Sequence, residues 1–170
     1  MTIRSYKGKT PVIDPTAFVS EAAYVVGDVT IGAGSSIWPG SVIRGESKIV
    51  IGRNVCVQDN STIHADGRGA QIGDNVVMGH NVMCHAAVVG DGAALGNGAI
   101  VNNDAEIGAG AVIASGAVVL DRAVVPENTL MVGVPAVAKT TVSEAVKARF
   151  ASTAQHYYEL GQAYKAEGWE

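Results

Sequence analysis

The chain has 170 residues, which is enough for one domain with a substantial core and too short for two. Its formal net charge is −4 and it has no basic cluster, so nucleic acid and anionic membranes are poor partners. No segment approaches the ~20 apolar residues of a membrane helix, and the first ten residues lack the apolar stretch of a signal peptide. Cys56 and Cys84 show no paired spacing, which is typical of a reducing compartment, so we expect a soluble cytoplasmic protein.

Aliphatic side chains recur every six residues over most of the chain, interrupted by a short insertion and by a loop at residues 65–71. A small or β-branched residue often stands four positions after such an anchor, and Gly often follows it directly. This period differs from the 3.6 residues of a helix and from the alternation of a simple sandwich. The anchors are Ile13, Val19, Val25, Ile31, Ile37, Ile43, Ile51, Val57, Ile63, Ile72, Met78, Cys84, Val89, Leu95, Val101, Ile107, Ile113, Val119, Val125 and Met131.

A unit of six residues is long enough for one short strand and one corner. Large aliphatic side chains then fill the interior, small residues fit the corners, and Gly allows the tight turns. Three units make one triangular coil, and successive coils stack ~4.8 Å apart as parallel strands. The repeat therefore predicts an all-β solenoid, a parallel β-helix, and general crossover rules favour a right-handed coil.

The end of the chain has a different pattern. Gly133 and Pro135 end the repeat, and Thr141 with Glu144 matches a helix capping box. We expect a β-helix domain at residues 1–140 and, at residues 141–170, a helix that packs along its outside. The apolar residues with helical spacing are Val146, Phe150, Ala154, Tyr157, Leu160 and Tyr164.

Three of the four histidines lie in the repeat, and the period assigns each of them to a face of the prism. Anchors three units apart share a face, so the residues that follow them point outward in one column. Arg44, His64, His85 and Asn102 form such a column. His64 and His85 are then neighbours about 5 Å apart at Cα, and their imidazoles can converge on one metal ion.

His80 falls in another column, above Asp59 and close to Gln58. Because a corner separates it from His85, its side chain leaves the prism in another direction. One chain therefore cannot close a site of three histidines, whereas a heterologous contact repeated about a threefold axis can. We predict a homotrimer with a metal site between each pair of subunits.

The remaining histidine and the two cysteines have simpler interpretations. His156 lies on the expected tail helix and is interpreted as a surface residue. Cys84 is interpreted as a packed anchor and Cys56 as a small buried side chain, although its closeness to Gln58 leaves a tuning role open.

These residues belong to a wider similarity that covers most of the chain. Over residues 11–139, and again around Tyr157, the sequence resembles the γ-class carbonic anhydrases. The repeat alone would be weak evidence, because acyltransferases share it. The motifs that carry the resemblance are Gly27-Asp28-Val29, Ile37-Trp38, Arg44-Gly45, Gln58-Asp59-Asn60-Ser61, Ile63-His64, Gly79-His80-Asn81 with His85, Val132-Gly133-Val134-Pro135-Ala136 and Gln155-His156-Tyr157.

The resemblance implies a left-handed parallel β-helix of hexapeptide repeats, in place of the right-handed coil that general rules favour. It also implies that His64 and His85 of one subunit bind the metal together with His80 of its neighbour. This ligand set agrees with the one that the columns predict.

The resemblance further assigns roles to residues around the metal. Gln58 is implied to orient the metal-bound water, and Tyr157 to reach from the helix toward the site. Arg44 and Asp59 match a pair that crosses the subunit boundary in the family.

Three departures from the family pattern concern the surroundings of the metal. Glu46 replaces an aspartate, so the acidic group after Arg44 is one methylene longer; it is a candidate proton relay or a partner of that arginine. Cys56 stands where the family has asparagine. The glutamate-bearing loop that shuttles protons is absent, since Ser47 follows Glu46 and the loop at residues 65–71 is short.

Three imidazoles leave a fourth metal position open, which is typical of a catalytic site. Zn²⁺ is the expected ion, and Fe²⁺ or Co²⁺ is compatible with the same ligands. The sequence thus predicts a carbonic anhydrase, a lyase that converts CO2 to bicarbonate, with weak activity because the proton-shuttling loop is missing. Two alternatives stay open: an acyl-CoA thioesterase or hexapeptide acyltransferase, and a non-enzymatic scaffold with a vestigial metal site.

Overall fold

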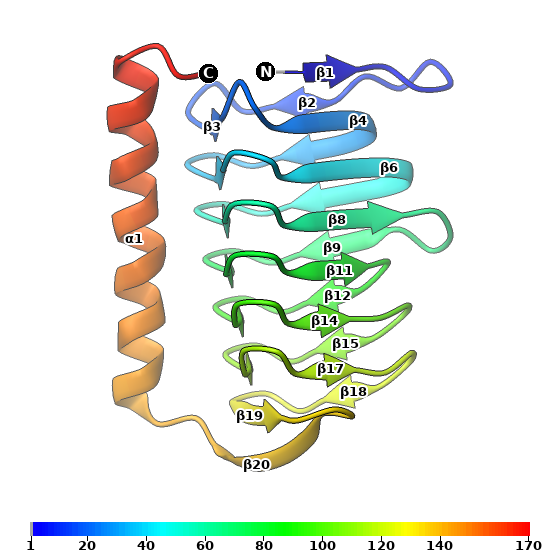
Figure 1. The fold of residues 1–170 in the computed structure, drawn as a ribbon, viewed down its shortest axis with the longest axis vertical. Coiled ribbons are helices and arrows are strands. Elements are labelled where there is room, and N and C mark those ends of the chain that lie inside the picture. Colours follow the sequence, from blue (N-terminus) through cyan, green and yellow to red (C-terminus); the bar gives the residue numbers. More distant parts are fainter. Residues whose placement is uncertain (1) are drawn as a thin grey trace.

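Three flat faces meet at corners to form each coil of the computed structural model, which describes residues 2–170 (Figure 1). The chain runs rightward along the front strands, returns along the fainter strands behind them, and descends by one coil (Figure 1). This path is left-handed, so the hand implied by the family resemblance is confirmed. The general rule fails because it rests on the twist of longer strands, and most strands here are only two residues long.

Parallel strands make up the three faces, which we call the front, back and helix faces. The front face contains β1 (Thr2–Arg4), the first parts of β4 (Tyr24–Ile31) and β6 (Val42–Ile51), β8 (Thr62–Ala65), β11 (Met83–His85), β14 (Ile100–Val101) and β17 (Val118–Val119). The back face contains β2 (Val12–Ile13), the last parts of β4 and β6, β9 (Ala70–Ile72), β12 (Val88–Val89), β15 (Glu106–Ile107) and β18 (Val124–Val125). The helix face contains β3 (Phe18–Val19), β5 (Ser36–Ile37), β7 (Cys56–Val57), β10 (Val77–Met78), β13 (Ala94–Leu95), β16 (Val112–Ile113) and β19 (Thr129–Val132).

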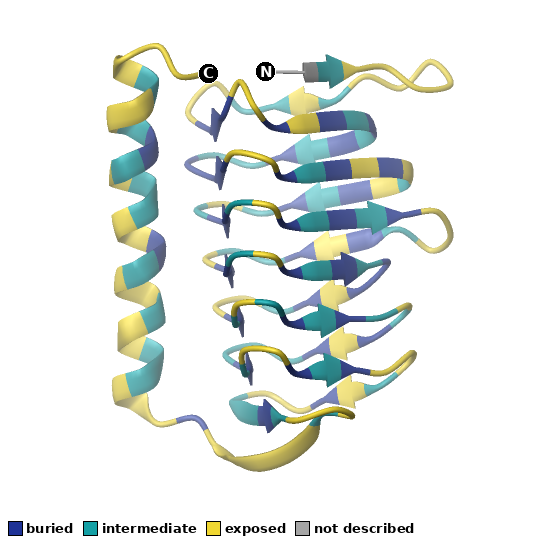
Figure 2. Cartoon of the chain, in the orientation of Figure 1, coloured by how far each residue is buried: buried dark blue, intermediate teal, exposed yellow. Residues whose placement is uncertain are grey.

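The repeat anchors fill the interior of the prism, as the six-residue period predicts. Apart from half-buried Ile13 in the first coil, every anchor is buried (Figure 2). Corner residues are equally buried, and where they are serines their hydroxyls satisfy backbone groups. Ser61 donates to the carbonyl of Gly79 at 2.8 Å and accepts from the amide of Val82 at 3.0 Å. Small corner residues therefore join consecutive coils without leaving an unpaired polar group inside.

Helix α1 (Glu144–Ala166) lies along the helix face and packs against β3, β5, β7 and β10 (Figure 1). The capping prediction was wrong in its residue: Ser143, not Thr141, is the N-cap, and its side chain accepts a hydrogen bond from the amide of Val146. Aromatic rings join helix to prism, with Trp38 5.5 Å from Tyr157 between ring centroids. Among residues 2–170, no helix is long and apolar enough to cross a membrane.

The chain reverses after the last parallel strand. Gly133 has a φ of +93°, and β20 (Val137–Thr141) then pairs antiparallel with β19. The sequence indicated the end of the repeat but not this added strand. Thr141 is its last residue, which is why it cannot cap the helix.

The corner between the front and back faces is formed by small residues. Gly27, Gly45 and Ala65 are aligned there in successive coils. Gly27 has a φ of +88°, and a Cβ atom added to it would overlap the carbonyl oxygen of Gly45. Glu46 directly follows Gly45, so this corner also positions a predicted site residue.

We predict that Gly27→Ala lowers the free energy of unfolding by more than about 3 kcal/mol, because it adds a backbone overlap to an unfavourable φ. Gly8→Ala is the matched control, since Gly8 has a φ of +76° but no atom near the added Cβ. That control should cost only about 1–2 kcal/mol. Denaturant unfolding measures both, and equal losses would contradict the overlap.

Candidate metal centre

Two imidazoles meet on the front face. The register pairs Arg44 with His64 and His64 with His85, so the predicted column is confirmed. His64 Nδ1 lies 2.7 Å from His85 Nε2, and the two rings are nearly perpendicular. The side chain of His64 is only 12% exposed. The solenoid thus brings together two ring nitrogens that are 21 residues apart in sequence.

Glu46 connects this histidine pair to Arg44. One carboxylate oxygen accepts from the Arg44 guanidinium, and the other lies 2.9 Å from His64 Nε2. Glu46 is thus a partner of Arg44, one of the two roles that the sequence left open, and it also contacts His64. Its role as a proton relay stays a prediction. Desolvation alone would raise the pKa of Glu46, but the hydrogen bond with His64 and the charge of Arg44 outweigh it, so this pKa is lowered.

The contact with Glu46 also determines which nitrogen of His64 is free to bind a metal. An ionised carboxylate only accepts hydrogen bonds, so His64 Nε2 carries the proton and Nδ1 presents its lone pair toward His85. A carboxylate that orients a histidine in this way is a common feature of metal sites.

The structure adds Asp66, which the sequence analysis did not select as a site residue. One ligand atom each of His64, Asp66 and His85 lies within 4.8 Å of the others. Asp66 follows His64 by two residues, and the alternation of a strand would have placed it on the same side. It was overlooked because it belongs to the charged loop after β8.

The pair of imidazoles fits a divalent cation of the zinc type. Nitrogen and carboxylate oxygen donors of this kind hold Zn²⁺, and Fe²⁺ or Co²⁺ accepts them as well. In addition, the buried His85 Nδ1 has no hydrogen-bond partner among the described residues, so the protein alone does not satisfy this ring. This atom is the nitrogen of His85 that does not meet His64, so it marks an unsatisfied ring and not the position of the ion.

His80 lies apart from this group, at the corner between the helix and front faces. Its Nδ1 is 3.1 Å from Asp59 Oδ2, and its amide donates to Asn97 at 3.1 Å. The side chains of His80 and Asp59 are 43% and 40% exposed. Within residues 2–170, His80 is not a member of the three-residue group around His64.

Gln58 and Tyr157 lie on the helix-face side of the same corner. Gln58 is 6% exposed and lies close enough to Cys56 to influence its thiol. Burial raises the pKa of that thiol to about 12, with Ser36, Gln58 and Trp38 acting in the opposite direction, so Cys56 is a packed thiol. Burial, with added effects of Cys56 and Asp59, raises the pKa of the Tyr157 phenol.

The candidate residues therefore form two groups on adjoining faces. The front-face group comprises Arg44, Glu46, His64, Asp66 and His85, and the corner group comprises Gln58, Asp59, His80 and Tyr157. No contact joins Arg44 to Asp59 among the residues described, so their implied pairing across subunits stays a prediction. His156 is exposed on the helix beside Tyr157, as expected.

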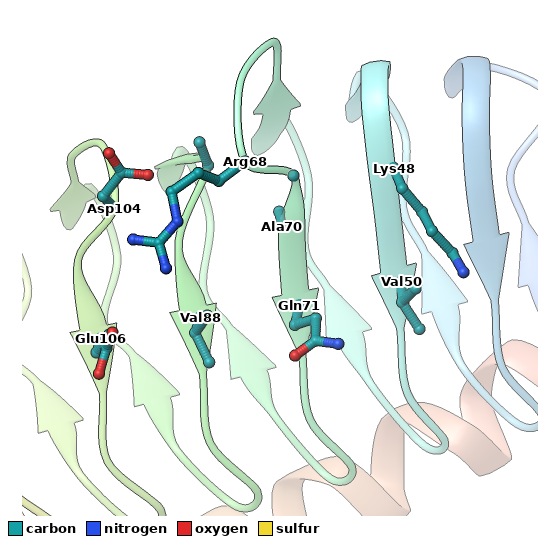
Figure 3. Close-up of a pocket in the computed structure, with 10 residues that line it drawn as sticks. Lys48, Val50, Arg68, Ala70, Gln71, Val88, Asp104 and Glu106 are labelled. Carbon is teal, nitrogen blue, oxygen red and sulfur yellow. The ribbon is translucent and has the colours of Figure 1, made fainter.

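A separate hollow of about 290 Å³ opens on the back face, behind the loop that carries Asp66 (Figure 3). Val50, Gln71, Val88 and Glu106 form its floor as one column of outward side chains. Arg68 extends over it toward Asp104, and Lys48 lies at the opposite end (Figure 3). The hollow contains no histidine.

Comparison with known proteins places the chain among hexapeptide-repeat proteins. Residues 86–121 match the family described as bacterial transferase hexapeptide (six repeats). A hexapeptide transferase family protein from Anaplasma phagocytophilum is 33% identical, with a TM-score of 0.93 over 96% of this chain and 98% of that one. A putative acetyltransferase from Bacillus cereus is 36% identical, with a TM-score of 0.95 over 97% of both chains.

A sequence relative supports the γ-class resemblance. Gamma carbonic anhydrase 1, a mitochondrial protein of Arabidopsis thaliana, is 41% identical over 85 residues. The match covers 45% of this chain and 31% of the relative, so it spans under half of the curated protein.

Proposed function

The chain belongs to the hexapeptide transferase family, and we propose that it is a carbonic anhydrase-like enzyme that hydrates CO2 at metal sites between the subunits of a homotrimer. The contact that carries this proposal is the His64–His85 pair, in which Glu46 holds the proton of His64 on Nε2. The γ-class relative agrees with this chemistry. An acyltransferase would need a single catalytic histidine and has no use for such a pair.

The front face supports contact with a second subunit. Its other outward column runs beside the histidines and is mostly apolar. Tyr24 at its upper end is exposed, and the members from Val42 onward are half-buried. A neighbour that covered this column would bring its own corner residues toward His64. The half-buried members of the column are Val42, Thr62, Met83, Ile100 and Val118.

In the proposed site, His64 and His85 of one chain and His80 of the next would hold the ion. A divalent cation in such a site lowers the pKa of water to about 7 and stabilises developing negative charge. Glu46 keeps the His64 ring in the required tautomer, and Arg44 keeps Glu46 ionised and in place. Gln58 of the neighbouring corner group is proposed to orient the attacking water through its amide.

The acyl-CoA alternative has less support from the geometry. The back-face hollow contains no histidine that could act as the catalytic base of acyl transfer. The scaffold alternative predicts bound metal without turnover, so an assay of CO2 hydration separates it from the proposed enzyme.

We predict that the purified protein is a trimer with about one metal per chain and that it hydrates CO2. His64→Ala should lose at least about 100-fold in hydration rate, because one of three ligands and the Glu46 contact disappear together. His156→Ala is the matched control and should behave as wild type, since His156 is an exposed helix residue. Light scattering, metal analysis and stopped-flow hydration measure the three properties. Hydration that survives in the His64 variant would exclude this site.

We further predict that hydration is limited by proton transfer to solvent. Two carboxylates lie near the ligands: Glu46, whose lowered pKa makes it a weak base at neutral pH, and Asp66, which is exposed to solvent. Turnover at saturating CO2 should therefore rise several-fold as an imidazole buffer is added, while kcat/KM stays constant. Fast turnover that is indifferent to buffer would instead reveal an efficient internal relay.

A further inference from the structure

The position of Asp66 has a consequence for a single chain. A short exposed turn at residues 66–68 joins β8 to β9, between the buried residues Ala65 and Ala70. Asp66 follows His64 by two residues, and its carboxylate lies near one ring nitrogen of His64 and one of His85. The three donor atoms lie within 4.8 Å of one another. Ligand atoms around tetrahedral zinc are separated by about 3.4 Å, so the two ring nitrogens, now 2.7 Å apart, must separate slightly while the exposed Asp66 carboxylate adjusts its position.

Other acidic residues near the histidines already have partners. Glu46 contacts Arg44 and the outer nitrogen of His64, and Asp59 contacts His80. Asp66 is exposed, and among residues 2–170 the ion pairs near the histidines are those of Glu46 and Asp59. The two oxygens of Asp66 are therefore available for a cation.

The far end of the same loop is held on the other side of the prism. Arg68 extends over the back-face hollow toward Asp104, away from the histidines (Figure 3). Gly69 has a φ of +93° and lies so close to the carbonyl of Lys48 that a Cβ atom would overlap it. The turn therefore enters the back face at a fixed point, while Asp66, at its start, stays next to the front face.

We propose that Asp66 is a metal ligand, and that His64, Asp66 and His85 form a capture site that lets one chain bind its ion before a neighbour arrives. Two imidazoles and one carboxylate are a sufficient ligand set for Zn²⁺ or Fe²⁺ in other proteins. This inference rests on the metal site of the proposed function and adds a second, intrachain state of that site.

Asp66 and the neighbour's histidine then compete for the ion. Three histidines and a carboxylate would fill all four tetrahedral positions and leave none for water. Arrival of His80 from another copy must therefore release Asp66 if the fourth position is to stay open for water. Assembly of the trimer thus exchanges one set of three ligands for another, with His80 in place of Asp66.

The test measures Zn²⁺ affinity by competition with a chelating dye, in full-length protein. His80→Ala removes the ligand from the neighbour and should still bind about one ion per chain. Adding Asp66→Asn to His80→Ala should weaken binding at least tenfold, because losing a direct ligand costs no less than losing a residue that orients one. Adding Asp104→Asn to His80→Ala is the matched control and should leave affinity unchanged, since Asp104 has a φ of +56° that asparagine tolerates.

Equal affinities of His80→Ala with and without Asp66→Asn would overturn the capture site while leaving the shared site intact. Absence of binding in His80→Ala alone would overturn it as well. Wild-type protein that binds no metal at all would instead reject the proposed function. Co²⁺ absorption gives a second readout: the His80 variant should keep a spectrum that changes when Asp66→Asn is added.

Discussion

The six-residue register that stacks each coil on the one below is the constraint on which the rest of the molecule depends. Buried anchors such as Ile43, Ile63 and Cys84 lock consecutive coils in phase, and a slip of one residue would turn every anchor outward. The same register decides which outward side chains become neighbours. His64 and His85 meet because Ile63 and Cys84 are stacked, so the packing of the core and the geometry of the candidate site have one cause.

The prism also explains why the candidate residues separate into two groups. A corner directs His80 and Asp59 away from the face that carries His64 and His85, while Glu46 and Asp66 stay with the histidine pair. A rigid solenoid cannot fold one face onto another. Contact between copies is therefore the available route by which the two groups could share an ion, and Asp66 offers each chain an intermediate ligand until that contact forms.

The sequence predicted those features that the repeat controls. The anchors, the buried corners and the column of Arg44, His64 and His85 follow from counting, because the period repeats the same local environment. Features outside the repeat were less predictable. Ser143 rather than Thr141 caps the helix because Thr141 is taken by β20, a strand that forms only through pairing with β19. The hand of the coil needed the family resemblance, since periodicity does not distinguish left from right.

The contacts made by individual long or loop-borne side chains were the other feature that the sequence did not predict. Glu46 contacts both Arg44 and His64, whereas the sequence identified its extra methylene without predicting which of the two it would reach. Asp66 lies in a loop whose path is set by the close approach of Gly69 to Lys48 on the back face. This approach does not affect the six-residue period, so the period could not predict it.

The most direct test of a site shared between subunits is complementation between two inactive variants. His64→Ala and His80→Ala are co-expressed with different tags, and mixed trimers are isolated and assayed for CO2 hydration. In a cyclic trimer of both variants, one site in about three receives an intact His64–His85 face and an intact His80, so roughly a third of wild-type activity should return. Mixed trimers no more active than their parents would show that the three histidines do not act together across the interface.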